Sequence, residues 1–140
     1  MVLIAQTDDE IRECHPVMRQ LRPQHDDADA FVARVRLQQS EGYVLAGLWD
    51  GDSVCAVAGF RLGNNLAWGK YLYVDDLVTD GTRRSKGHGK RLLDWLCAHA
   101  REEACDQLHL DSGVQRFAAH RFYLRDGHMS ITSHHFQLEL

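Results

Sequence analysis

Basic side chains and glycines are concentrated in one short run of this chain, residues 83–91. Five of the 16 Lys and Arg residues lie there, around Gly87 and Gly89. A strand-like segment, 71–79, precedes the run, and leucines at helical spacing follow it. Such a turn directs free backbone N–H groups and the positive end of a helix dipole at one place, which suits a phosphate. The sequence therefore predicts an anion site; the alternative is a basic helix start exposed to solvent.

Two familiar phosphate loops do not fit this run. A P-loop needs four residues between its two glycines and a Ser or Thr after its Lys, but Gly81 and Gly87 have the wrong spacing and Arg91 follows Lys90. A dinucleotide-binding fingerprint needs a third glycine for close helix packing, and none follows Gly89 at that place. Both interpretations are therefore disfavoured.

Length and composition are those of an ordinary globular protein. The chain has 140 residues, which predicts a single domain over 1–140. Its net charge of −4 argues against a general nucleic-acid binder. No signal peptide and no apolar run of membrane-spanning length is present. We therefore expect no membrane partner and a cytoplasmic location.

Cysteines and histidines give no pattern typical of a metal site. The four cysteines include no CxxC pair, and the nine histidines include no HxH or HExxH spacing. Cys55 and Cys97 lie in strand and helix patterns, so we expect them to be small buried side chains in a reduced setting. No bound metal is predicted.

Hydrophobic periodicity predicts helices and strands around one sheet. In the first half we expect a strand at 2–6, a helix that begins after Thr7 and that Pro16 delays or kinks, and a second helix from Asp26 to Gly42. Strands are expected at 43–48, 54–60 and 72–78, with turns at 50–52 and 63–65.

The second half continues with a helix after the basic run, a strand at 108–110 and a helix at 117–124. One or two strands are expected within 129–140, with a turn near Ser133. The element order β-αα-βββ-α-β-α-β(β) predicts an α/β domain of the α+β type. Its central sheet would be mixed, mostly antiparallel and flanked by helices.

The motif Arg84-x-x-Gly87-x-Gly89 resembles the acyl-CoA loop of the GCN5-related N-acetyltransferase (GNAT) family, Q/R-x-x-G-x-G/A. Three segments strengthen the resemblance: DDLVTD at 75–80 is similar to the family's EDLVVDP, GHGKRLL at 87–93 to GIGKALL, and FYLRDGH at 122–128 to FYEKLGF. They occur in the family's order and spacing. The resemblance covers nearly the whole chain, is weakest before Tyr43, and implies the family's acyl-CoA N-acyltransferase fold.

The resemblance implies acetyl-CoA as cosubstrate. The pyrophosphate would lie on backbone amides of the loop, which are those of Arg84, Ser85, Lys86, Gly87, His88, Gly89 and Lys90, with Arg83 adding charge. The pantetheine arm would pair with Leu77, Val78 and Thr79. Arg116 stands where the family often has an asparagine and could still reach a phosphate. His120 could contact the cofactor or be a plain surface histidine.

The family also implies acetyl transfer to a primary amine by direct attack in a ternary complex. Tyr123 would protonate the departing thiolate, and the alternative is a core tyrosine. Asp76 is the expected base, and Asp75 or a water chain is the alternative. Both carboxylates could instead be solvated, or one could pair with an arginine. Because neighbouring strand residues face opposite sides, at most one of the two carboxylates is expected to face the site.

The acceptor would be an amine-bearing small molecule or peptide. Asp75, Asp111 and His134 are the expected substrate-binding residues, and the acidic side chains favour a cationic amine. His134 or His135 could instead lie at the edge of a possible homodimer. A different class of function, a non-catalytic acyl-CoA-binding or regulatory domain, would keep the loop without the chemistry.

Overall fold

A five-stranded sheet organises the chain, in the order β1-β2-β3-β4-β5. The computed structural model describes residues 1–84 and 86–140. The strands are β1 (Val2–Ile4), β2 (Val44–Asp50), β3 (Ser53–Asn65), β4 (Gly69–Thr79) and β5 (Gln107–Leu110). Neighbours among the first four are antiparallel, and β5 runs parallel to β4. The expected mixed, mostly antiparallel sheet is confirmed.

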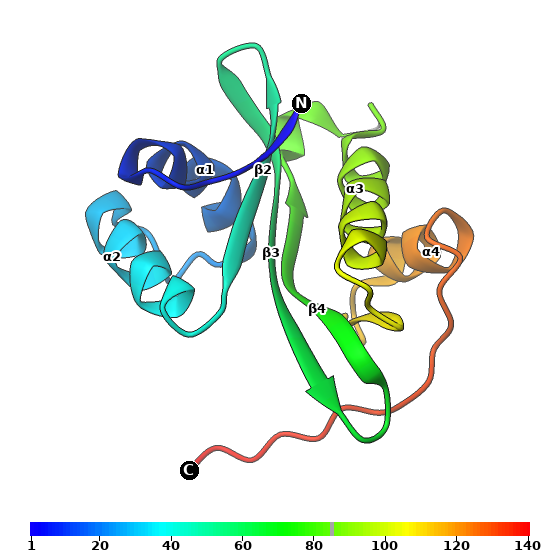
Figure 1. The fold of residues 1–140 in the computed structure, drawn as a ribbon. Helices are drawn as coiled ribbons and strands as arrows, with labels where there is room; N and C mark the ends of the chain where they lie inside the picture. The colour runs from blue at the N-terminus through cyan, green and yellow to red at the C-terminus, as the bar shows by residue number, and fades with distance from the viewer. Residues whose placement is uncertain (85) are drawn as a thin grey trace.

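Helices cover both faces of this sheet (Figure 1). The helices α1 (Asp8–Leu21) and α2 (Ala28–Gln39) lie on one face, and α3 (His88–Glu102) and α4 (Phe117–Arg125) lie on the other. Each face has its own apolar core, one built on Ile11, Phe31 and Leu45, the other on Phe60, Leu72 and Leu96. Within the described residues, no helix combines the length and the apolar character needed to span a membrane.

The first helix begins where the sequence predicts and is not delayed by its proline. Thr7 and Glu10 form a capping box, in which each side chain accepts a hydrogen bond from the other's backbone N–H, at 3.2 and 3.0 Å. The helix then continues through Pro16 to Leu21. Buried side chains at helical spacing, among them Ile11 and Met18, hold it against the sheet.

The hairpin between β3 and β4 is longer than the sequence predicts. We expected a turn at 63–65, but β3 continues to Asn65 and the turn occupies 66–68. The side chain of Asn65 accepts the Trp68 N–H at 2.6 Å, which closes the turn. A Cβ on Gly63 would lie 2.5 Å from the Tyr71 hydroxyl, so this glycine makes room for a cross-strand ring and does not turn the chain.

Residues 129–140 do not form the expected strands. Residues 130–140 are all exposed, including Ile131, Phe136 and Leu138. An apolar alternation forms a strand only when a neighbouring strand and a core face it. Within the described residues no strand pairs with this tail, and β5 pairs with β4 alone. The prediction of terminal strands is therefore wrong for this structure.

Candidate functional site

The central feature of the site is a β-bulge in β4. Gly59 of β3 pairs with Asp76 and the next residue, Phe60, pairs with Val74, so Asp75 has no partner in β3. An extra residue of this kind interrupts the alternation of side chains along a strand. Val74, before the bulge, and Leu77, after it, both pack in the core beneath α3. In a regular strand, two residues three positions apart would face opposite sides of the sheet.

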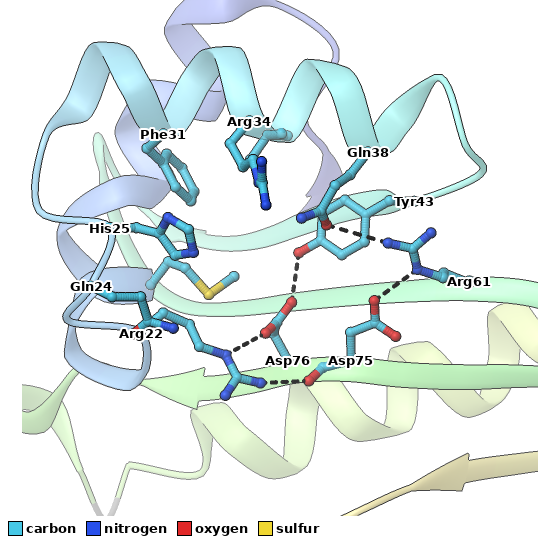
Figure 2. A pocket seen from close by; sticks show the side chains of 12 residues that line it. Arg22, Gln24, His25, Phe31, Arg34, Gln38, Tyr43, Arg61, Asp75 and Asp76 are labelled. Carbon is cyan, nitrogen blue, oxygen red and sulfur yellow. Dashed lines mark hydrogen bonds and ion pairs between the residues drawn. The ribbon is translucent and has the colours of Figure 1, made fainter. Parts of the chain in front are cut away.

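Because of the bulge, Asp75 and Asp76 both line the same cavity, on the face covered by α1 and α2 (Figure 2). The expectation that at most one of these carboxylates would face the site is therefore wrong. Each is paired with an arginine: Arg22 Nε lies 2.8 Å from Asp76 Oδ1, and Arg61 Nε lies 2.8 Å from Asp75 Oδ2. Arg22 also donates to the backbone carbonyl of Asp75 at 2.9 Å.

This first cavity has a volume of about 310 Å³ and lies between α2 and the bulge. Its walls combine charged, polar and apolar side chains: Met18, Arg22, Gln24, His25, Phe31, Arg34, Val35, Gln38, Tyr43, Arg61, Asp75 and Asp76. Figure 2 shows Arg34 and His25 extending into this space from α2 and from the segment before it. The cavity is large enough for a small molecule.

Tyr43 braces the bulge from the far side of β3. Its hydroxyl donates to Asp76 Oδ2 at 2.8 Å. Burial, and then the nearby Asp76 carboxylate, raise the pKa of Tyr43 well above its ordinary value of 10.0. Tyr43 is therefore a neutral donor, and both carboxylate oxygens of Asp76 already accept a hydrogen bond.

A second cavity, of about 290 Å³, opens where β4 and β5 separate. The two strands pair only from Tyr71 to Val74 on the β4 side, so β4 continues beyond the bulge without β5 beside it. The lining residues are Leu21, Arg22, Val74, Asp75, Leu77, Leu110, Asp111, Gly113, Gln115, Arg116 and Tyr123. We refer to this space between the diverging ends of β4 and β5 as the slot.

Tyr123 is the buried residue of α4, 9% exposed, and it lines the second cavity. Burial raises the pKa of its phenol above the ordinary 10.0, and Arg116 opposes this shift. The phenol therefore carries its proton at physiological pH. Arg22 and Asp75 line both cavities, so the two spaces adjoin at the bulge.

The basic run leads into α3 through a left-handed glycine. Gly87 is the N-cap residue with φ +77°, a conformation that favours glycine, and no side chain caps the helix. The Arg91 N–H bonds to the Gly87 carbonyl, so the N–H groups of residues 88–90 precede the first intrahelical hydrogen bond. A Cβ on Gly89 would lie 3.3 Å from Thr79 Oγ1, so Gly89 also lets α3 start close to β4.

The cations of this run differ in their surroundings. Lys90 pairs with Asp94 at 2.7 Å, and Arg83 lies 3.9 Å from Asp50. Arg84 and Lys86 are exposed, and Ser85 lies outside the described residues. His88 contributes its backbone at the helix start, while its side chain is buried at 7% exposure.

Of the remaining predicted residues, some line the second cavity and others lie away from it. Arg116 and Asp111 line it, and the Tyr73 hydroxyl donates to Asp111. His120 Nε2 donates to the Gly113 carbonyl at 2.7 Å, so it supports the loop before α4. Val78 packs into the core beneath α1 and α2. His134 is exposed in the tail and lines neither cavity.

Sequence reasoning missed most of the first cavity. Arg22, Arg34, Arg61 and Tyr43 come from four segments that share no motif. A weak signal was present at Arg61, a charged residue directly after an apolar strand run. Nothing in the sequence distinguished Arg34 from Arg36, the other arginine of α2.

Comparison with known proteins finds acetyltransferases. The model of the acetyltransferase (GNAT) family matches residues 4–128. The uncharacterized N-acetyltransferase YhdJ of Bacillus subtilis (strain 168) is 35% identical over 130 residues, which are 92% of this chain and 91% of that protein.

Solved structures share the fold along the whole chain. The ribosomal-protein-alanine N-acetyltransferase from Brucella melitensis biovar Abortus 2308 has a TM-score of 0.84 at 15% identity, covering 100% of this chain and 99% of that one. The glucosamine-6-phosphate N-acetyltransferase from Arabidopsis thaliana has a TM-score of 0.78 at 20% identity, covering 99% and 97%. Their names indicate different acceptors, so the acceptor has to be inferred from the side chains of the site.

Proposed function

The chain belongs to the acetyltransferase (GNAT) family and is an acetyl-CoA-dependent acetyltransferase; we propose that it acetylates a primary amine by direct attack in a ternary complex. The observation that supports this most is that two cavities adjoin at Arg22 and Asp75. A donor in the slot between β4 and β5 and an acceptor beneath α2 would meet there. Holding both reactants together supplies much of the rate enhancement of such a transfer.

The residues around the second cavity fit acetyl-CoA, which supplies the acetyl thioester. The N-terminal amides of α3, with Arg84 and Lys86 beside them, suit the pyrophosphate. The unpaired edge of β4 after Val74, along Leu77 to Thr79, offers backbone groups to the amides of the pantetheine arm. Arg116 adds a cation at the mouth of the slot.

Tyr123 is proposed as the general acid. The amine nitrogen forms a bond to the acetyl carbon as the carbon–sulfur bond breaks, and the Tyr123 phenol gives its proton to the departing sulfur. Solvent then reprotonates the phenol. The burial of Tyr123 beside the slot supports this role because it keeps the phenol neutral.

The two carboxylates at the bulge are suited to different tasks. Both oxygens of Asp76, the residue we expected as base, accept hydrogen bonds from Arg22 and Tyr43, so we propose that it positions these two side chains. Asp75 lines both cavities, and of its two oxygens Oδ2 accepts from Arg61. We therefore propose that Asp75 receives the proton of the amine, directly or through water.

Calorimetric titration with acetyl-CoA tests the function. Wild type is expected to bind it, and Gly89→Trp is expected to lose binding because the new ring fills the space between α3, Thr79 and Phe122. Ala98→Trp places the same ring on the exposed side of α3 and serves as the control. Failure of wild type to bind acetyl-CoA would contradict the proposal.

We also propose that the chain forms a homodimer through its tail. Ile131, Phe136 and Leu138 are 77%, 91% and 81% exposed, and a second copy would cover them. Light scattering after size exclusion would give the mass of wild type and of Phe136→Ser/Leu138→Ser. A monomeric wild type at assay concentration would contradict this proposal.

A further inference from the structure

We infer that the acceptor amine carries an anionic group, a carboxylate or a phosphate, which binds Arg34 in the first cavity. This inference rests on the proposed function, because it assigns the first cavity to the acceptor. It extends the expectation from the sequence, in which acidic side chains favoured a cationic amine.

The charges that line the cavity are unequal. Arg22, Arg34 and Arg61 supply three guanidinium groups, against two carboxylates. The carboxylates are each held by one of these arginines: Asp76 by Arg22 and Asp75 by Arg61, both at 2.8 Å. Two cations are thus matched, and the guanidinium of Arg34 is the charge left over.

Arg34 is placed to meet a ligand. It extends from α2 into the space above the bulge (Figure 2), and it has no carboxylate within 4.0 Å in the part of the chain that the structure describes. A guanidinium binds planar carboxylates and phosphates through paired N–H groups. His25 and Gln24 line the same side of the cavity and add polar contacts.

The positions of Asp75 and Arg34 fix the orientation of the acceptor in the first cavity. Asp75 lies where the two cavities adjoin, so the amine belongs at that end. Arg34 belongs to the α2 wall of the first cavity, so the anionic group belongs there. With a cavity of about 310 Å³, the acceptor is a small molecule with an amine at one end and an anionic group at the other.

Acetylation of matched amines tests the inference. The members of each pair differ in the anionic group: amino acids and their carboxamides, phosphoethanolamine and ethanolamine, phosphorylated and free amino sugars. Wild type is expected to have a lower KM for the anionic member of at least one pair. Arg34→Gln is expected to raise that KM about ten- to a hundredfold, the effect of a charge-assisted hydrogen bond, and to leave the neutral member unchanged.

Two further variants define the cause. Arg34→Lys keeps the charge and is expected to restore part of the preference. Arg101→Gln removes the same charge from an exposed position of α3 that lines neither cavity, and it is expected to change nothing. Equal KM values within every pair for wild type, or a preference that Arg34→Gln leaves intact, would overturn the inference.

A titration without acetyl-CoA separates this inference from the proposed function. Inorganic phosphate and acetate are added in turn while the arginine Nε–Hε signals are followed by nuclear magnetic resonance. Saturable shifts are expected at the Arg34 signal, which Arg34→Gln identifies by its absence, and the dissociation constants show which anion is preferred. No saturable shift at Arg34 with either anion would overturn the inference even if acetyl-CoA binds. Binding at Arg34 without acetyl-CoA binding would contradict only the proposed function.

Discussion

Tyr43 reaches over a neighbouring strand to hold Asp76, with 2.8 Å between the phenol oxygen and the carboxylate. The strand that it crosses is β3, at Gly59. A Cβ there would lie 1.8 Å from the Tyr43 hydroxyl oxygen, so the absence of a side chain creates the path. This contact joins the bulge in β4 to the start of β2, outside any strand pairing.

Tyr43→Phe is expected to destabilise the protein by about 1–3 kcal/mol, the cost of leaving a largely buried carboxylate oxygen without its donor. Urea unfolding measures the effect. Tyr73→Phe is the matched control, because it removes a phenol that donates to Asp111, whose side chain is 48% exposed and can bond to water. Equal losses in the two variants would show that the Tyr43 contact has no special weight.

Gly59→Ala is expected to destabilise the protein by about 2 kcal/mol or more, because the added carbon and the Tyr43 ring cannot occupy the same space. A double-mutant cycle with Tyr43→Ala measures the coupling. In the Tyr43→Ala background the same glycine substitution is expected to cost little. If the two free energies simply add, the clash is not the cause.

Tyr123→Phe is expected to lower kcat about a hundredfold or more and to leave acetyl-CoA binding unchanged. Since burial raises the pKa of Tyr123 above 10.0, the wild-type phenol stays protonated from pH 6 to 9. The ratio of wild-type to variant kcat should therefore be constant over that range. Tyr71→Phe, which lines neither cavity, is the control. An unchanged kcat would exclude Tyr123 as the acid.

Stability is expected to fall at alkaline pH because of Cys14. Burial raises the pKa of this thiol from 9.0 to about 12. Between these values the unfolded chain has released the proton and the folded chain keeps it, so the free energy of unfolding falls by about 1.4 kcal/mol per pH unit. Below pH 9 the thiol is protonated in both states and this stabilisation is fully present.

Cys14→Ala is expected to reduce that slope, measured by urea unfolding at pH 8, 9 and 10. Tyr43, also buried with a raised pKa, leaves a residual slope as the pH rises past 10.0. Cys105→Ala changes a partly exposed thiol and is the control. A slope that Cys14→Ala leaves unaltered would contradict the assignment.

The sequence predicted the features that depend on local pattern. Helical spacing and a capping residue located α1, and a basic glycine turn after a strand located the start of α3. The fold could be predicted as well, because the element order and the family motifs indicate the same architecture. The terminal strands were predicted wrongly, because alternation within residues 129–140 does not say whether a partner strand is available.

The first cavity could not be predicted, for a different physical reason. Its charge balance depends on which arginine pairs with which carboxylate, and Arg22 is 54 residues from Asp76. Alternation suggested that Asp75 and Asp76 face apart, and one unpaired residue reversed that result. Bulges depend on how two strands fit together, which neither strand encodes alone.

The bulge also changes which positions of β4 face α3, so that the strand has one frame of alternation before Asp75 and another after it. Leu72 and Val74, before it, point toward α3 from even positions, whereas Leu77, after it, does so from an odd one. Val78, an even position, faces α1 and α2. Removing Asp75 would restore a single frame with Asp76 still facing α1 and α2, and it would take away the carboxylate that lines both cavities. The length of β4 is therefore as much a part of the site as any of its side chains.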